Sequence, residues 1–164
     1  MHPHDPPLRP PAHQVNPRAV RWWQLRALPW LVVLGGPQAV IVLTTDAPGW
    51  LYALGAATAL GVLVYALVVP RILFRIHRWE VTDEAVYTLS GWLVREWRIA
   101  PISRMQTVDT QHGPLQQLLK LATVTVTTAS ARGAVKIAGL DAQDAAQLAR
   151  TLTETTQATP GDAT

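Results

Sequence analysis

The sequence predicts an α+β membrane protein, in which a transmembrane hairpin of two helices precedes a small β-rich domain with a C-terminal helix. Three observations lead to this fold class. Two long stretches near the N-terminus, residues 27–45 and 50–69, contain no charged residue and no histidine. Short β-prone segments separated by glycine and proline follow them. The last regular segment, from residue 142 onwards, repeats apolar residues at helical spacing.

The two charge-free stretches have the length of membrane-spanning helices. At about 1.5 Å rise per residue, each would span about 30 Å, the thickness of the hydrocarbon core of a bilayer. A short polar turn at residues 45–49 joins them, so they are expected to form an antiparallel hairpin. Gly35, Gly36 and Pro37 predict a kink in the first helix, because proline removes one donor from the helical ladder.

The same stretches could instead be buried helices of a soluble protein, or the first could be a cleaved signal peptide. Core helices seldom run this long without a charge. The first stretch is too long for the apolar region of a signal peptide, and no small-residue cleavage site follows it. A second apolar stretch comes at once, so the hairpin is the favoured interpretation.

Arginines on the flanks of the hairpin predict its orientation. They occur before the first stretch and after the second, at Arg9, Arg18, Arg21, Arg26, Arg71, Arg75 and Arg78. The turn between the stretches has one acidic residue, Asp46, and no basic one. The positive-inside rule therefore predicts a two-span protein of the cell membrane with both termini in the cytoplasm.

The chain is expected to divide into four parts. Residues 1–20 are rich in proline and predict a disordered or extended tail. Residues 21–70 form the hairpin, residues 71–156 form a cytoplasmic domain, and residues 157–164 form a second disordered tail. His2, His4 and His13 lie in the first tail without an ordered scaffold, so they do not predict a metal site.

Composition excludes several classes of function. The chain has no cysteine, which rules out disulfides, thiolate metal sites and cysteine nucleophiles. Acidic residues outnumber basic ones after residue 78, so the positive net charge belongs to the membrane flanks. A nucleic-acid-binding protein concentrates positive charge on its folded domain, and no nucleic-acid partner is therefore expected.

Residues 71–156 predict an antiparallel β domain. Its β-prone runs lie at residues 86–89, 92–99, 106–110, 123–128 and 134–138. Valine and threonine alternate in the run 123–128, which is typical of a strand with one buried face. Asp141 can cap the terminal helix through its carboxylate.

A short helix is predicted between two of these strands. Pro114 suits its first position. Leu115, Leu118 and Leu119 lie on one face of this helix, and we expect them to pack inward.

Three motifs in this domain carry a resemblance to a known family. They are PxxRMQxVD at residues 101–109, QxGPLQ at 111–116 and LAxVxVxTA at 121–129. In this order they resemble the bacterial membrane-flanked pleckstrin-homology-like (YdbS-type) domain family, over residues 20–155. The resemblance implies a PH-like split β-barrel with a C-terminal helix, attached to a membrane hairpin, and it does not imply an enzyme.

The chain departs from this family at Lys120. Relatives commonly have a glycine in the stretch after Pro-Leu-Gln, where this chain has Lys120. Glycine adopts a positive φ without strain, whereas lysine does so at a cost in free energy. We therefore expect a strained turn at this lysine.

Candidate chemical groups in the domain do not form a site in the sequence. His77, Glu80, Asp83 and Glu84 are too widely spaced along an extended segment to hold one metal ion. Asp109 and His112 are expected to form hydrogen bonds within a turn. No Gly-rich phosphate loop or nucleophile motif occurs. The sequence therefore predicts no catalysis, no cofactor, no metal and no small-molecule substrate.

The arginines after the hairpin are the candidate functional residues. Arg71, Arg75 and Arg78 emerge from the membrane, and Arg95 and Arg98 would extend this patch if their strand faces the bilayer. These five residues could contact lipid headgroups, or could serve only to set the topology.

Two functions follow from these expectations. The first is a non-catalytic interaction or scaffold module, anchored at the membrane, whose exposed strand edge binds a protein partner or a second copy of the chain. The alternative is an anionic-lipid sensor that uses the arginine patch.

Overall fold

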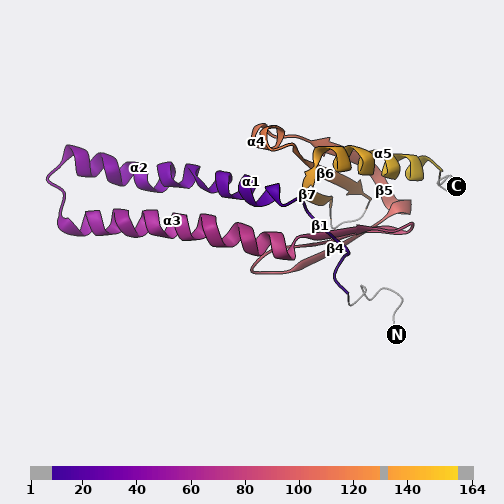
Figure 1. Cartoon of the computed structure of the whole chain (residues 1–164), viewed down its shortest axis with the longest axis horizontal. Coiled ribbons are helices and arrows are strands. Elements are labelled where there is room, and N and C mark those ends of the chain that lie inside the picture. The colour runs from indigo at the N-terminus through magenta and orange to yellow at the C-terminus, as the bar shows by residue number, and fades with distance from the viewer. Residues whose placement is uncertain (1–8, 130–132, 159–164) are drawn as a thin grey trace.

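The N-terminal helices project from the β-rich domain as a long two-helix arm (Figure 1). The computed structural model describes residues 9–129 and 133–158. One side of the arm consists of α1 (Arg18–Ala27) and α2 (Pro29–Thr44), and the other is α3 (Gly49–Ile76). In the most apolar 18-residue stretch of each side, only 6% (α1 and α2) and 17% (α3) is buried, whereas a core helix of a soluble protein would be mostly buried. This exposure favours helices that face lipid.

The first side of the arm is interrupted at a position that was not expected. α2 continues as one helix through Gly35, Gly36 and Pro37, and the kink there stays a prediction. The helix is interrupted instead at Leu28, immediately before Pro29. Pro29 has no N–H to donate, and a proline in the first turn of a helix costs little because that donor would be unpaired anyway.

The β domain consists of two antiparallel sheets. One has the strand order β1-β2-β3-β4 and the other β5-β6-β7. The strands are β1 (His13–Gln14), β2 (Arg78–Val81), β3 (Ala85–Ser90), β4 (Glu96–Pro101), β5 (Met105–Gln111), β6 (Leu121–Thr128) and β7 (Val135–Asp141). Two separate sheets confirm the predicted PH-like split arrangement, and within the described residues they do not close into one barrel.

Three helical elements complete the domain. The short 3-10 helix η1 (Ile102–Arg104) leads from the first sheet to the second, and α4 (Pro114–Leu118) lies between β5 and β6. The terminal helix α5 (Ala142–Ala158) covers the second sheet. Asp141 caps it as predicted, because its Oδ1 accepts a hydrogen bond from the Gln143 N–H at 3.1 Å.

The main core lies between the two sheets and α5. Val124 and Val126 of β6 are fully buried in it, as their alternation with threonine predicts. From α5, Ala145, Leu148 and Leu152 complete this core. The described part of α5 reaches Ala158, so it includes residues 157–158 of the predicted tail, and the rest of that tail lies outside the described residues.

Two elements differ from the prediction. The run 92–99 becomes a strand only from Glu96, because β3 ends in a tight turn at Gly91 and residues 91–95 form a loop. In α4, Leu118 is 81% exposed and Gln116 is the buried residue. The Gln116 side chain bonds to the Gly113 N–H at 3.0 Å and to Thr123 Oγ1 at 2.8 Å, so its polar groups are satisfied on the side facing the sheet.

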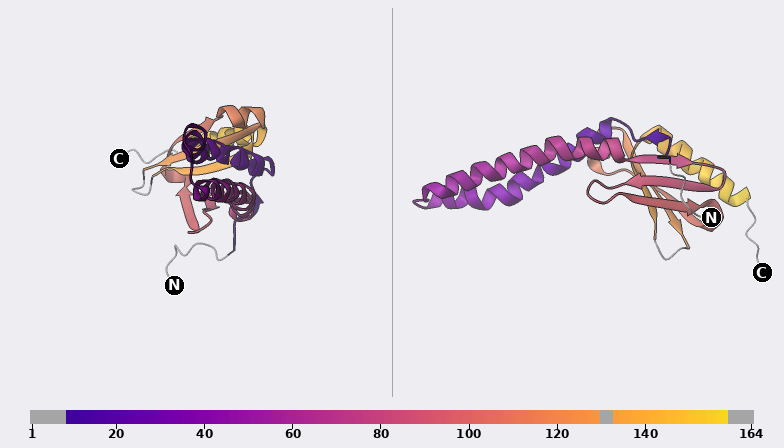
Figure 2. Two further views of the ribbon diagram at one scale, coloured as in Figure 1. Left: turned by 90° about the vertical axis from the view of Figure 1, so that its left-hand side faces the viewer. Right: turned by 90° about the horizontal axis from the view of Figure 1, so that it is seen from below.

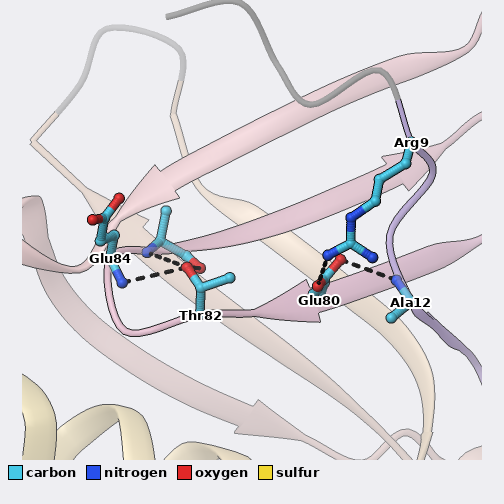
Figure 3. Close-up of polar contacts among 6 residues, drawn as sticks. Arg9, Ala12, Glu80, Thr82 and Glu84 are labelled. Atoms are coloured by element: carbon cyan, nitrogen blue, oxygen red, sulfur yellow. Dashed lines mark hydrogen bonds and ion pairs between the residues drawn. The ribbon is translucent and has the colours of Figure 1, made fainter. Parts of the chain in front are cut away.

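Residues 9–20 are ordered, in contrast to the predicted disordered tail. β1 pairs with β2, and the Glu80 carboxylate accepts hydrogen bonds from Arg9 at 2.7 Å and from the Ala12 N–H at 3.1 Å (Figure 3). Val15 and Ala19 are buried. Pro10 and Pro11 precede β1, and their fixed φ reduces the entropy that this segment loses on ordering. Residues 1–8 lie outside the described part of the chain.

A second core, the junction cluster, joins the arm to the domain. Its members are Val15, Ala19, Trp22 and Leu121, with Trp23, Phe74, Trp79, Leu119 and Ala138 packed against them. They come from α1, α3, both sheets, the segment before α1 and the turn after α4. The contact is closest at Gly139, which has a φ of +82° and on which a Cβ would lie 2.7 Å from the Ala19 Cβ. Glycine is therefore required here both for its backbone conformation and for its lack of a side chain.

His77 lies at the exit of α3, beside the junction cluster. Its ring packs 5.4 Å from the Trp23 ring, and within the described residues its Nδ1 has no hydrogen-bond partner. Burial lowers the pKa of His77 from its ordinary value of 6.5, because the charged imidazolium loses its hydration there.

We expect Gly139→Ala to cost roughly 2–4 kcal/mol of stability, about 1–2 from the left-handed backbone and the rest from the clash with Ala19. Gly133→Ala is the matched control, because Gly133 has a φ of +76° but open space around its Cβ position. It should cost only the backbone part, roughly 1–2 kcal/mol. Thermal unfolding of the full chain in detergent measures both, and equal losses would contradict close packing at Gly139.

We expect Lys120→Gly to leave stability unchanged or to raise it by up to about 1 kcal/mol, because Lys120 has a φ of +55°. Among the described residues it alone has a positive φ without being glycine. Lys136→Gly is the control, since Lys136 is an exposed residue of β7 and should lose roughly 0.5–1 kcal/mol. A clear loss of unfolding temperature for Lys120→Gly would contradict strain at this turn.

We expect the stability of the full chain to fall as pH drops below about 6.5. The unfolded chain binds the His77 proton at a higher pH than the folded chain does, so protons stabilise the unfolded state in that window. His77→Asn should reduce this pH dependence, and His112→Asn should keep it. Unfolding temperatures between pH 5 and 8 test this, and a His77→Asn profile identical to the wild type would contradict it.

Candidate functional site

Four of the five predicted arginines lie at the end of the domain that faces the arm. Arg71 and Arg75 are exposed on the last turns of α3. Arg78 begins β2 and is half-buried, whereas Arg95 is exposed in the loop between β3 and β4. The register explains this placement, because Arg78 pairs with Leu89 close to the end of β3, from which that loop starts.

Arg98 does not join this group as a free cation. Its Nη2 lies 2.7 Å from Glu96 Oε1, and its Nη1 donates to the Ala134 carbonyl at 3.0 Å. The acidic partner two residues earlier neutralises it on the same face of β4. Arg98 is thus held in contacts within the domain, and Arg71 donates from its Nη1 to the Leu67 carbonyl of α3. Contact of the other four with lipid headgroups stays a prediction.

The sequence missed three further cations near the arm. Arg21 lies at the rim of an apolar groove of about 380 Å³ between α1, α3 and the end of α4, lined among others by Leu28, Leu67 and Leu119. Arg18 and Lys120 line a neighbouring hollow, where Arg18 forms an ion pair with Asp141 at 3.4 Å. The helical spacing of apolar residues around Arg18 and Arg21 was the available signal, but residues 1–20 were assigned to a disordered tail and both arginines only to the topology of the hairpin.

The second candidate surface is the free edge of β5. This strand pairs with β6, and among the described residues no strand pairs with its other edge. A small cavity of about 150 Å³ lies between β5 and α5. Its lining residues are Met105, Gln106, Thr107, Val108, Thr153 and Thr156. The sequence predicted an exposed strand edge without locating it.

The candidate metal and acid–base groups are not brought together. Glu80 binds the N-terminal segment, and His77 packs against Trp23. Asp83 and Glu84 occupy the turn between β2 and β3, which the Thr82 side chain stabilises by accepting the Glu84 N–H at 3.3 Å (Figure 3). Within the described residues, no group of three His, Asp or Glu side chains could hold a metal ion.

Asp109 and His112 bind separate partners. The Thr107 hydroxyl donates to Asp109 Oδ2 at 3.3 Å, and His112 Nδ1 lies 3.1 Å from the Leu121 carbonyl. The Asp109 side chain thus stabilises β5 itself, and the His112 side chain stabilises the connection from β5 to α4.

Comparison with known proteins agrees with this architecture. The model of the bacterial PH domain family matches residues 29–156, from the start of α2 into the last turn of α5. The chain is also similar to the UPF0699 transmembrane protein YdbS of Bacillus subtilis (strain 168), with 32% identity over 126 residues. This similarity covers 73% of the chain and 78% of that protein. No solved structure matches the chain significantly.

The family match includes α2 and α3, so the two apolar helices and the two sheets are covered by one model. A relative described as a transmembrane protein is similar in sequence over most of its length. The chain therefore belongs to the bacterial PH domain family, as a member with a transmembrane hairpin.

Proposed function

We propose that this protein is a non-catalytic interaction module, anchored in the membrane, whose domain binds a protein partner or a second copy of the chain at the cytoplasmic face. The free edge of β5 is the observation that carries this proposal. An edge strand offers unpaired backbone N–H and C=O groups to an incoming strand. The cavity between β5 and α5 would receive a side chain of that added strand.

The composition of β5 supports an edge that is open to pairing. Natural proteins block such edges with lysine, proline or a bulge. β5 contains neither lysine nor proline. A register shift between Met105 and Thr107 affects only its beginning, so the rest of the strand stays regular. Thr107, Asp109 and Gln111 are exposed along it.

The position of the cavity also supports access from the aqueous phase. α5 runs away from the arm towards the C-terminus (Figure 1), and Thr153 and Thr156 in its last turns line the cavity. The cavity therefore lies at the end of the domain that is distant from the arm. The arginine-rich flanks support a cytoplasmic location of this domain by the positive-inside rule.

Membership in a PH-like family and the scattered positions of ionisable side chains support a role without catalysis. An anionic-lipid sensor is the second candidate. The exposed positions of Arg71, Arg75 and Arg95 at the end facing the arm favour it, because each could gain about 1 kcal/mol near an anionic surface.

We expect Thr107→Cys, labelled with a maleimide photo-crosslinker in native membranes, to form one discrete adduct. The chain has no other cysteine, so within this chain the label attaches only at the introduced position. Gln147→Cys, on an exposed position of α5, is the matched control and should form no such adduct. The mass of the adduct distinguishes a second copy of the chain from another protein.

A further variant tests strand addition itself. Thr107→Lys, made in a chain that is labelled at Asp109→Cys, should weaken the adduct roughly fivefold or more, since a charge that blocks an edge costs about 1 kcal/mol. Equal adducts from Thr107→Cys and Gln147→Cys, or none from either, would contradict binding at this edge.

A further inference from the structure

The loop between β3 and β4 exposes three consecutive apolar side chains. Trp92 is 43% exposed, and Leu93 and Val94 are each 78% exposed. Single exposed apolar residues are ordinary on a soluble surface, but a consecutive run at the tip of a loop indicates a contact. Arg95 follows them and is also exposed.

The conformation of this loop is defined by close backbone contacts. Gly91 has a φ of +95°, and a Cβ there would lie 1.9 Å from the Val94 carbonyl oxygen. Only glycine allows the chain to turn back this tightly. β3 and β4 pair up to Ser90 and Glu96 on either side. The apolar tip is therefore held at the end of a regular hairpin.

The sheet register directs this tip towards the arm. β2 continues from α3 away from the arm, and β3 returns antiparallel to it, so that Leu89 lies beside Arg78. Figures 1 and 2 both show the loop that follows β3 reaching back beyond the end of α3. The short helix α4, with its exposed Leu118, also lies at this end of the domain (Figure 1).

The dimensions bring the tip to the surface of the bilayer. The exposed apolar band of α3 ends at Val68, and residues 69–76 add about 12 Å of helix. His77 and Arg78 add about 7 Å before β3 returns, because Leu89 lies level with Arg78. From Leu89 the chain returns by about three residues to the tip of the loop, which is about 10 Å at 3.3 Å per residue. The tip thus lies roughly 9 Å beyond the end of the apolar band, at the level of the headgroup layer.

We propose that residues 91–95 insert into the interfacial layer of the bilayer and form a second membrane contact of this protein, in addition to the hairpin. Trp92 suits the headgroup level, where indoles concentrate. Leu93 and Val94 remove apolar surface from water by entering the acyl boundary. Arg95 extends to the phosphate groups from the same loop, as Arg75 does from α3.

The bilayer is the occupant because this surface continues the apolar surface of the hairpin. A hairpin that spans the membrane places the plane of the headgroups at the end of the domain where this loop lies. Arg95 directly follows the apolar tip, and Arg71 and Arg75 are exposed on the last turns of α3, which matches an anionic or zwitterionic lipid surface. A protein covering the loop would itself have to lie in the headgroup layer.

The test uses Leu93→Cys in the full chain, labelled with a polarity-sensitive fluorophore and reconstituted in phosphatidylcholine vesicles. Asp83→Cys is the matched control, because Asp83 lies in the turn at the opposite end of β2 and β3. We expect nitroxide-bearing lipids to quench most of the Leu93→Cys fluorescence and aqueous iodide to quench little of it. The control should show the reverse.

Two results would overturn the proposal. Equal quenching of both labels by iodide would show that the loop lies in water. Protection of the Leu93→Cys label from both iodide and lipid nitroxides would show that protein covers it. Val94→Cys, equally exposed, repeats the measurement independently if the first variant does not fold.

Discussion

The junction cluster is the contact on which the arrangement of this protein depends. It packs Trp22 of α1 against Leu121 of β6, with Phe74 of α3 and Trp79 of β2 beside them. Each large apolar side chain buried there contributes about 1.5–3 kcal/mol relative to an exposed one. The hairpin and the domain are therefore held by a shared core, in addition to the two chain connections at residues 15–17 and at His77. A shared core fixes the angle at which the domain meets the membrane, and both proposed surfaces depend on that angle.

The N-terminal segment is what makes the junction possible. It adds β1 to the first sheet, and it places Ala19 against Gly139 of the second. Asp141 connects the same segment to the terminal helix, because Asn16 and Arg18 each donate to its Oδ2 at 3.4 Å while its Oδ1 caps α5. Residues far apart in the sequence thus meet at the Asp141 carboxylate, which links the start of α1 to the start of α5.

The parts of this fold that local patterns determine could be predicted from the sequence. The hairpin follows from charge-free length, β6 from its alternation, and the cap at Asp141 from its side chain. The strained turn at Lys120 followed from a departure from related sequences, and its φ of +55° confirms it. The order of residues 9–20 depends on pairing with β2 across a long sequence separation, and the composition of that segment does not reveal it.

In the candidate site, too, some features follow from local sequence patterns and others depend on the fold. The positions of Arg71 and Arg75 follow from their closeness to the apolar stretch, whereas the exposed tip at residues 91–95 depends on where β3 ends. The sequence assigned Trp92, Leu93 and Val94 to a strand because such residues favour strands, but the turn at Gly91 outweighs that preference.

In α4, hydrogen bonds rather than apolarity decide that Gln116 faces the sheet. The Arg98–Glu96 pair was visible at two-residue spacing, which places both side chains on one face of a strand.

The two proposed surfaces are compatible because they lie at opposite ends of the domain. The apolar tip of the β3–β4 loop and α4 face the arm, whereas the cavity beside β5 is lined by the last turns of α5. A domain attached only through the end of α3 could tilt and bring either surface to the bilayer. With the junction cluster fixing the hairpin and the loop adding a second contact, such a tilt would require apolar side chains to leave the junction core and the interface together. The edge of β5 would then stay accessible from the aqueous phase, which is the condition that strand addition requires.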